Sequence, residues 1–204
     1  MLTTENKAKI AVLVSSGGTN LQALIDAQAS GIISSGEIVL VISSKDGVFA
    51  LERAANAGIP TAVVSKKQCG SQEAFEKGII DKLDEYEVDL IVLAGFMSIL
   101  SADFTSRYPE RIINVHPALI PSFCGKGAYG LHVHEMALEY GVKVTGATVH
   151  FVNEIPDGGK IIAQKAVYIE DGDTPEILQR RVMEQAEWII LPQATEKVCA
   201  QIIG

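Results

Sequence analysis

The chain has 204 residues, of which 48% are hydrophobic and 21% are charged, and its formal net charge is −8 at pH 7. At about 150 residues per domain this length predicts one domain, and the apolar content with the modest net charge excludes an intrinsically disordered chain. The acidic total argues against a nucleic-acid binder. Three cysteines (Cys69, Cys124 and Cys199) are typical of a reduced, cytoplasmic protein rather than a secreted, disulfide-rich one.

Two apolar runs are too short for membrane targeting or insertion. Ile10–Val14 is shorter than the apolar region of a signal peptide. Leu90–Ala102 carries no charge before Asp103, but it falls short of the roughly 18 apolar residues that a membrane span needs. We therefore expect no membrane association.

Strand-like apolar runs alternate with helical patterns over the first 116 residues. Strands are predicted at Lys9–Val14, Glu37–Ser43, Thr61–Val64, Leu90–Ala94 and Arg111–His116, and helices at Thr19–Ala29, Phe49–Ala57, Ser71–Tyr86 and Ser101–Tyr108. This order predicts an α/β fold, a doubly wound and mostly parallel sheet with helices on both faces. The strands are continuously apolar, as expected when both faces are covered.

The pattern changes after Pro117. A long loop is predicted at 117–130, a helix at His132–Tyr140, strands at Val144–Val152 and Lys160–Ile169, and one long helix at Thr174–Gln201, bent near Pro192. The connection of residues 153–159 is short, which favours an antiparallel pair of strands. We therefore expect a single domain over residues 1–204, with a doubly wound half at 1–116 and an extension at 117–204 that holds antiparallel strands and a long terminal helix.

A glycine-rich turn, Ser15-Ser-Gly-Gly-Thr-Asn-Leu-Gln22, follows the first strand. Thr19 with Gln22 three residues later predicts a capping box. The glycines allow close approach of a ligand, and the free N–H groups at the helix start favour a single phosphate. The turn is neither a P-loop nor a dinucleotide-binding turn. A tight capped turn without a ligand is the alternative interpretation.

A second motif, Asn114-Val-His116-Pro117, ends the last strand of the first half. Asn114 and His116 share a face because side chains alternate along a strand. Ligands of open α/β sheets lie beyond the carboxyl ends of the strands. An amide N–H and an imidazolium N–H are donors suited to a developing oxyanion, and the same pair could move a proton to or from an amine. A histidine that merely ends the strand is the alternative.

A third motif, Asp157-Gly158-Gly159, connects the two late strands. Taken alone, it predicts a turn. As a functional group, the carboxylate of Asp157 would lie beside His116, raise the pKa of the imidazole and hold its charged form. His150, on the preceding strand, could line the same cleft.

Two further features carry weaker functional predictions. His132 and His134 do not share a helix face and lack nearby partner ligands, so we expect no metal, and we expect one histidine to line the cleft while the other is exposed. Cys124 lies in a glycine-rich segment, residues 122–130, which predicts a mobile lid rather than a nucleophile.

With these motifs in place, the chain resembles the phosphoribosylglycinamide formyltransferases, the folate-dependent transformylases of purine synthesis. The resemblance runs from about Ile10 to about Pro192 and is carried by Ser15–Gln22, Leu93–Met97, Asn114–Pro117, Gly130–His132, His150–Val152 and Asp157–Gly159. It implies a Rossmann-like formyltransferase fold and a cytoplasmic enzyme that uses no metal. It also implies transfer of the formyl group of 10-formyltetrahydrofolate, the co-substrate, to the amine of 5'-phosphoribosylglycinamide.

The resemblance also implies residue roles. Asn114, His116 and Asp157 would be catalytic; Gly18, Thr19, Asn20, Glu184 and Glu187 would bind the phosphorylated substrate; Gln72, Met97, Ser98, Ile99, Leu100 and Asn114 would bind the folate. Residues 1–116 would then form the phosphate-binding half, and 117–204 the folate and catalytic extension. The two glutamates align only with a one-residue insertion after Val182. Gln72 and Ser98 stand where the family often has arginines that reach the folate's acidic tail. The expected partners are small molecules, with the chain a monomer or a homodimer.

Two other readings stay open from the sequence. A formyltetrahydrofolate hydrolase or another formyltransferase, such as a methionyl-tRNA formyltransferase, shares this catalytic core, although a pI near 5.0 argues against a tRNA enzyme. A non-catalytic phosphate-binding module would explain the glycine turn but not Asn114, His116 and Asp157.

Overall fold

The structure, a computed structural model, describes residues 7–204. Its strands follow the order β3-β2-β1-β4-β5-β6-β7 in one seven-stranded sheet. The chain divides into two compact units, Met1–Leu100 with Thr195–Gly204, and Ser101–Ala194. The strand pairs are parallel in the first unit and antiparallel in the second, which confirms the predicted α/β class. The single domain over 1–204 stays a prediction.

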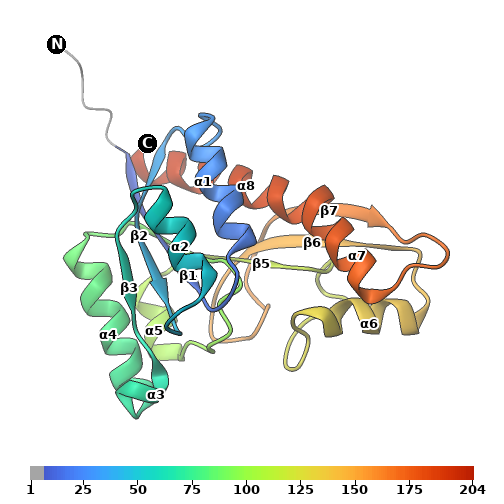
Figure 1. Ribbon diagram of the computed structural model, residues 1–204, viewed down its shortest axis with the longest axis horizontal. Coiled ribbons are helices and arrows are strands. Elements are labelled where there is room, and N and C mark those ends of the chain that lie inside the picture. Colours follow the sequence, from blue (N-terminus) through green and yellow to red (C-terminus); the bar gives the residue numbers. More distant parts are fainter. Residues whose placement is uncertain (1–6) are drawn as a thin grey trace. The chain divides into compact units, whose positions relative to one another are not determined.

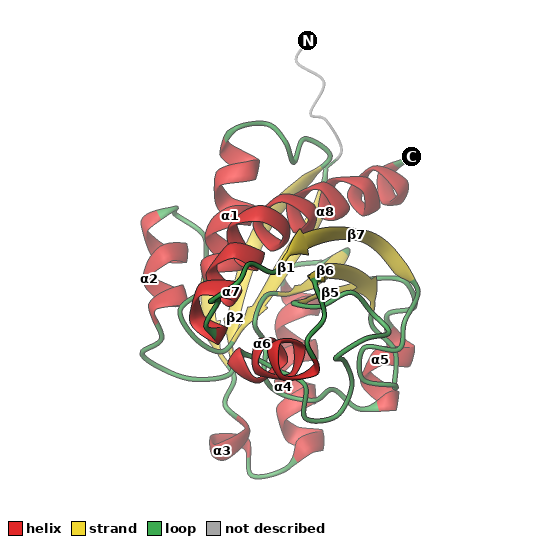
Figure 2. Cartoon of the chain, turned by 90° about the vertical axis from the view of Figure 1, so that its right-hand side faces the viewer, coloured by secondary structure: helices red, strands yellow, loops and turns green. Residues whose placement is uncertain are grey.

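The first unit is a parallel sheet wound by helices. Its elements before the C-terminal helix are β1 (Ala8–Val14), α1 (Thr19–Ala29), β2 (Gly36–Ser43), α2 (Phe49–Asn56), β3 (Thr61–Val63), α3 (Lys66–Cys69), α4 (Gln72–Glu85) and β4 (Leu90–Leu93) (Figure 1). Strand β2 pairs with β1 and β3, and β1 also pairs with β4. Because parallel crossovers are right-handed, α1 and α2 cover one face and α4 the other, as Figure 2 shows. The short helix α3 was not predicted.

Strand β1 lies between β2 and β4, and the side chains of β1 and β4 are almost all buried. The last residues of the C-terminal helix close the same unit. The carboxylate of Glu196 accepts hydrogen bonds from the backbone and side chains of Ser34 and Ser35. Gly36, at the start of β2, lies so close to Cys199 that an added Cβ would meet its sulfur at 2.6 Å.

The second unit carries the antiparallel strands. Its elements are α5 (Ala102–Arg107), β5 (Ile112–His116), α6 (Leu131–Tyr140), β6 (Val144–Phe151), β7 (Ile161–Tyr168), α7 (Pro175–Val182), a π-helix (Met183–Glu187) and the start of α8 (Trp188–Ile203). Strand β6 pairs antiparallel with β5 and β7. The predicted antiparallel pair on either side of residues 153–159 is thereby confirmed.

The predicted long terminal helix is present, and its bend near Pro192 stays a prediction. The segment consists of α7, the π-helix and α8, and Pro192 lies inside α8. A π-turn closes its hydrogen bond over five residues rather than four, so it holds one residue more than an α-turn. The π-helix begins directly after Val182, which is where the family alignment needs its extra residue. None of the helices in residues 7–204 has both the length and the apolar character that crossing a bilayer requires.

Candidate active site

The glycine turn of the first unit is built against helix α2. Gly18 adopts the left-handed conformation with φ of 72°, and a Cβ there would lie 2.6 Å from the Cβ of Ala50. No residue with a side chain fits this contact without a shift of the backbone, and the φ value favours glycine in any case. Helix α1 begins at the next residue, Thr19. The turn therefore delivers the chain into α1 in one fixed geometry.

The capping box predicted for Thr19 and Gln22 is wrong. Gly18 is the N-cap, so Thr19 is already inside the helix and its hydroxyl cannot cap it. The side chain of Gln22 bonds instead to Asp26 and accepts from Arg53. No side chain caps the N-terminus of α1. The backbone N–H groups of its first turn are therefore the donors that an anion would contact.

Ser15 connects this turn to the segment predicted to bind folate. Its hydroxyl is buried, accepts a hydrogen bond of 2.9 Å from the backbone N–H of Met97, and lies 2.7 Å from the hydroxyl of Ser44. The position of residue 97 is thus tied to the end of β1. Both sequence-predicted binding segments of the first unit share one anchoring residue.

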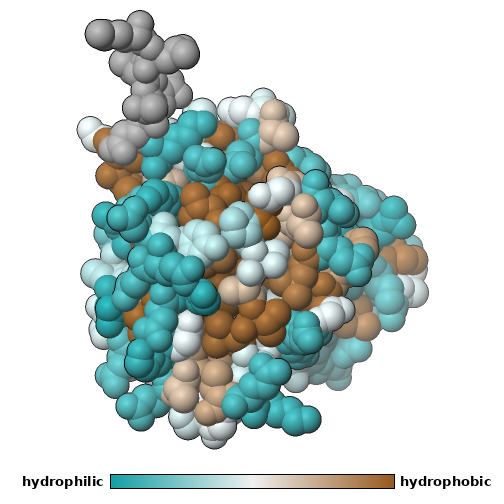
Figure 3. Space-filling model, turned by 60° about the vertical axis from the view of Figure 1, so that its left-hand side comes forward, coloured by the Kyte–Doolittle hydropathy of each residue, from teal (hydrophilic) through white to brown (hydrophobic). Residues whose placement is uncertain are grey.

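The predicted folate residues of the first unit gather in one place. The side-chain amide of Gln72 donates to the carbonyl oxygen of Ile99 at 3.0 Å. Met97 and Ile99 expose 50% and 74% of their surface, whereas Leu100 is buried. Figure 3 shows one face of the molecule on which apolar residues gather between hydrophilic ones. Exposed apolar side chains are suited to pack against an aromatic ring.

In the second unit, the end of β5 meets β6 in register. Asn114 pairs with His150 and His116 with Thr148. The amide nitrogen of Asn114 lies 3.3 Å from Nε2 of His150, and Nδ1 of His150 lies 2.8 Å from the carbonyl oxygen of Phe151. That carbonyl only accepts, so Nδ1 of His150 carries a proton, and in the neutral ring Nε2 accepts from Asn114. The second amide hydrogen of Asn114 is then left for another acceptor.

Asp157 lies between two histidines. Its carboxylate oxygens are 3.6 Å from Nδ1 of His116 and 3.6 Å from Nε2 of His150. It also accepts a hydrogen bond of 2.8 Å from the backbone N–H of Gly125. The backbone of Asp157 has φ of 56°, and an added Cβ at Gly159 would lie 1.7 Å from the carbonyl oxygen of Phe151. The Asp-Gly-Gly turn therefore has a fold that presents the carboxylate to both imidazoles.

The structure thus brings Asn114, His116 and Asp157 together, as the sequence analysis expected. It adds His150, which sequence reasoning placed only in the same cleft and not among the catalytic residues. The sequence did indicate a place for His150 in the site, because side chains alternate along a strand and His150 therefore shares a face with Thr148. Its contact with Asn114 depends on the antiparallel register of β5 and β6, which the sequence did not predict.

A loop residue, Phe123, contacts Nε2 of His116. Nε2 of His116 lies 2.8 Å from the carbonyl oxygen of Phe123, so it carries a proton and donates it. The same loop supplies Gly125 to Asp157. In this conformation, the donor that an oxyanion would use is occupied by the backbone of the segment predicted to be a lid. Mobility of that segment stays a prediction.

Burial controls the protonation of this cluster. Burial lowers the pKa of His116 below its ordinary value of 6.5 and outweighs the nearby Asp157 carboxylate, which raises it. The prediction that the pKa of His116 is raised is therefore wrong. Burial alone would raise the pKa of Asp157, but the contacts with His150 and Gly125 and the two nearby imidazoles lower it overall. The carboxylate is thus charged at neutral pH, and His116 can be neutral.

The two histidines of α6 differ in environment. His132 is exposed and contacts Glu135 at 2.9 Å. His134 is buried, and among the described residues neither of its ring nitrogens has a hydrogen-bond partner. Burial and the neighbouring His116 lower the pKa of His134 to about 4. This confirms that one histidine of the pair is exposed, and that the other lines the cleft stays a prediction.

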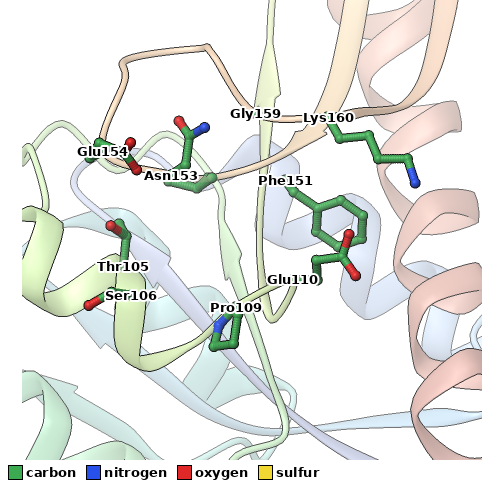
Figure 4. Close-up of a pocket in the computed structure, with 10 residues that line it drawn as sticks. Thr105, Ser106, Pro109, Glu110, Phe151, Asn153, Glu154, Gly159 and Lys160 are labelled. Carbon is green, nitrogen blue, oxygen red and sulfur yellow. The ribbon is translucent and has the colours of Figure 1, made fainter.

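The two predicted substrate glutamates lie on the π-helix. Glu184 is exposed and pairs with Arg180 at 2.8 Å, whereas Glu187 is buried. A hollow of about 270 Å³ lies elsewhere in this unit, and none of its residues is among the predicted catalytic or binding residues. Figure 4 shows its lining, with α5 and the turn after it on one side and both ends of the Asp157 loop on the other: Thr105, Ser106, Pro109, Glu110, Phe151, Asn153, Glu154, Gly159 and Lys160.

Comparison with known proteins shows that most of this chain is similar to formyl transferases. The family model described as formyl transferase matches residues 8–195. Phosphoribosylglycinamide formyltransferase from Escherichia coli is 43% identical over 176 residues, covering 86% of this chain and 80% of that protein. The structure of glycinamide ribonucleotide transformylase 1 from Symbiobacterium toebii superposes with a TM-score of 0.90 at 38% identity, covering 98% of this chain and 92% of that one.

Several relatives that are longer proteins are also similar to this chain. The trifunctional purine biosynthetic protein adenosine-3 of Gallus gallus is 49% identical over 195 residues, which is 96% of this chain and 19% of that protein. The chain thus spans about a fifth of the length of the trifunctional relatives it matches.

Proposed function

The chain belongs to the formyl transferase family, and on that premise we propose that it transfers the formyl group of 10-formyltetrahydrofolate to the amine of 5'-phosphoribosylglycinamide. The observation that carries the proposal is the convergence of Asn114, His116 and Asp157, with two side-chain donors beside one half-buried carboxylate. The products are the formylated amide and tetrahydrofolate, which makes the chain an enzyme of purine biosynthesis.

Each substrate has its own set of candidate residues. The backbone N–H groups of Gly18, Thr19 and Asn20 and the hydroxyl of Thr19 hold the phosphate at the start of α1, with Glu184 and Glu187 assigned to the rest of that substrate. The folate lies on the segment 97–100 with Gln72, and Asn114 reaches its formyl group. The support for the folate segment is its exposed apolar side chains and the contact of Gln72 with Ile99.

The reaction is a direct acyl transfer. The substrate amine attacks the formyl carbon and forms a C–N bond, and the formyl C=O becomes a tetrahedral oxyanion. Nε2–H of His116 and the second amide N–H of Asn114 donate to that oxyanion, which is the role of a preorganised oxyanion hole. Collapse of the intermediate re-forms the C=O bond and breaks the bond to N10 of the folate, which leaves with a proton.

The proton has to move from the attacking amine to N10. The carboxylate of Asp157, whose lowered pKa keeps it charged at neutral pH, takes up the amine proton by way of water and returns it to N10. Nδ1 of His116 faces this carboxylate, so Nε2–H stays on the oxyanion. Asp157 holds the imidazole in place and balances its charge while it is protonated. His150, through its contact with Asn114, fixes the amide so that one N–H faces the reacting group. The carbonyl of Phe123 has to leave Nε2 of His116 before this can occur.

A cofactor-consumption assay tests the proposal. The purified chain is incubated with 10-formyltetrahydrofolate, with and without 5'-phosphoribosylglycinamide, while tetrahydrofolate formation is followed. Loss of the formyl cofactor that depends on the second substrate supports the transferase. Loss without it identifies a hydrolase, and no loss in either arm identifies a non-catalytic phosphate-binding module. The cytoplasmic location and the monomeric or homodimeric state stay predictions.

A further inference from the structure

An arginine that the proposed reaction does not use contacts the glycine turn at two points. Arg53, on helix α2, donates from Nε to the carbonyl oxygen of Gly17 at 2.9 Å, and from Nη1 to the side-chain oxygen of Gln22 at 2.9 Å. Its guanidinium carbon lies 4.7 Å from the centre of the Phe49 ring. The side chain therefore spans from the turn to the first helical turn of α1 and is held on one side by an aromatic ring.

These contacts set the direction of the peptide groups in the turn. The carbonyl of Ser16 accepts from the backbone N–H of Ala50, and the carbonyl of Gly17 accepts from Arg53, so both point toward α2. In a trans peptide the N–H points opposite to the C=O. The N–H groups of Gly17 and Gly18 consequently point away from α2, to the side from which an anion can approach them.

The positive charge of Arg53 is important for anion binding because the chain as a whole is negatively charged. The chain carries a net charge of −8, and such a field disfavours a dianionic phosphate unless local donors compensate. In the part of the chain that the structure describes, Arg53 contacts a carbonyl oxygen, an amide oxygen and an aromatic ring. None of these partners carries a negative charge, so the positive charge of the guanidinium is not cancelled.

We infer that Arg53 is a positioning residue for the substrate's phosphate. It aims the turn's N–H groups outward through Gly17 and places an uncompensated positive charge at the base of the turn. The inference rests on the proposed function insofar as it takes the phosphate to bind at Gly18–Asn20. In this role Arg53 acts on the phosphate alone, so its effect is on binding of the phosphorylated substrate and not on the chemical step.

The test separates binding from chemistry with three variants. Arg53→Ala removes both hydrogen bonds and the charge. Arg53→Lys keeps the charge but loses the planar guanidinium that makes the two hydrogen bonds. Glu52→Ala changes the neighbouring exposed residue of the same helix as the control. With saturating formyl-folate, we expect Arg53→Ala to raise the KM for 5'-phosphoribosylglycinamide by about tenfold or more and to change kcat by less than about threefold. Arg53→Lys should fall between wild type and Arg53→Ala, and Glu52→Ala should behave as wild type.

Binding of ribose 5-phosphate, measured by calorimetry, provides a readout that needs no formyl transfer. We expect Arg53→Ala to weaken it by about tenfold, and added salt to weaken wild-type binding more than that of the variant. An unchanged affinity for ribose 5-phosphate in a folded Arg53→Ala protein would overturn the inference. So would a fall in kcat with no change in KM. If the chain consumes no formyl-folate but its ribose 5-phosphate affinity still depends on Arg53, the proposed function fails and the inference about Arg53 stands. If Arg53→Ala does not fold, Arg53→Lys decides by the same two measurements.

Discussion

The buried imidazole of His134 predicts a loss of stability in mild acid. His134 is 1% exposed, and its pKa is lowered from 6.5 to about 4 by burial and by His116. In the unfolded chain the imidazole has an ordinary pKa near 6.5, so between these two values the unfolded chain binds a proton that the folded chain does not. Stability is therefore complete above the ordinary pKa and falls as the pH drops from about 6.5 toward 4.

The size of the effect follows from the two pKa values. At about 1.36 kcal/mol per pKa unit, the difference between 6.5 and about 4 corresponds to about 3 kcal/mol over the whole range. At pH 5 the unfolded imidazole is largely protonated and the folded one largely neutral, which gives about 2 kcal/mol. That is a substantial part of the roughly 5–15 kcal/mol by which a domain of this kind is stable.

Urea unfolding at pH 7.5 and pH 5 measures this contribution. His134→Met removes the titrating group, keeps a long apolar side chain, and breaks no hydrogen bond known among the described residues. We expect wild type to lose about 2 kcal/mol more than His134→Met between the two pH values. His132→Met, on the same helix but exposed, should lose as much as wild type. Equal losses for wild type and His134→Met would refute the reasoning.

Further substitutions test the proposed roles. His116→Ala and Asp157→Asn should each lower kcat by about a hundredfold or more, the scale of a lost oxyanion donor, and near-normal turnover in both would remove their assigned roles. Gly18→Ala should destabilise the chain by about 1–3 kcal/mol in thermal or urea unfolding, because of its positive φ and the 2.6 Å contact of a Cβ with Ala50; wild-type stability would show that the turn relaxes freely. Thr19→Val should mainly raise the KM of the phosphorylated substrate in steady-state kinetics, and an unchanged KM would favour a turn without a ligand.

Local sequence rules predicted the elements of the fold well where burial is uniform. The apolar runs at Leu90–Leu93 and Ile112–His116 are strands within a residue or two of the expected bounds. The alternation of side chains placed Asn114 and His116 on one face without any knowledge of the partner strand. Pairing between distant segments is a different matter, because register depends on contacts that a local pattern does not encode. The contact of Asn114 with His150 is of that kind.

The errors share a physical cause, which is that tertiary contacts override local preferences. Thr19 and Gln22 fit a capping box, yet Gly18, packed against Ala50, is the N-cap and Thr19 is the first residue inside the helix. Asp157 does raise the pKa of His116, but the sequence carries no measure of burial, and burial dominates. The π-helix at Met183–Glu187 follows from one extra residue in a helical segment, which periodicity alone does not reveal.

A crystal structure with a folate analogue and the phosphorylated substrate bound tests the central assignment most directly. We predict that the oxygen standing for the formyl oxygen lies roughly 3 Å from both Nε2 of His116 and the amide nitrogen of Asn114. Phe123 would no longer contact His116, and Asp157 would still face the imidazole. A ligand-filled site in which Nε2 of His116 stays on the Phe123 carbonyl, with the formyl oxygen held elsewhere, would contradict the assignment.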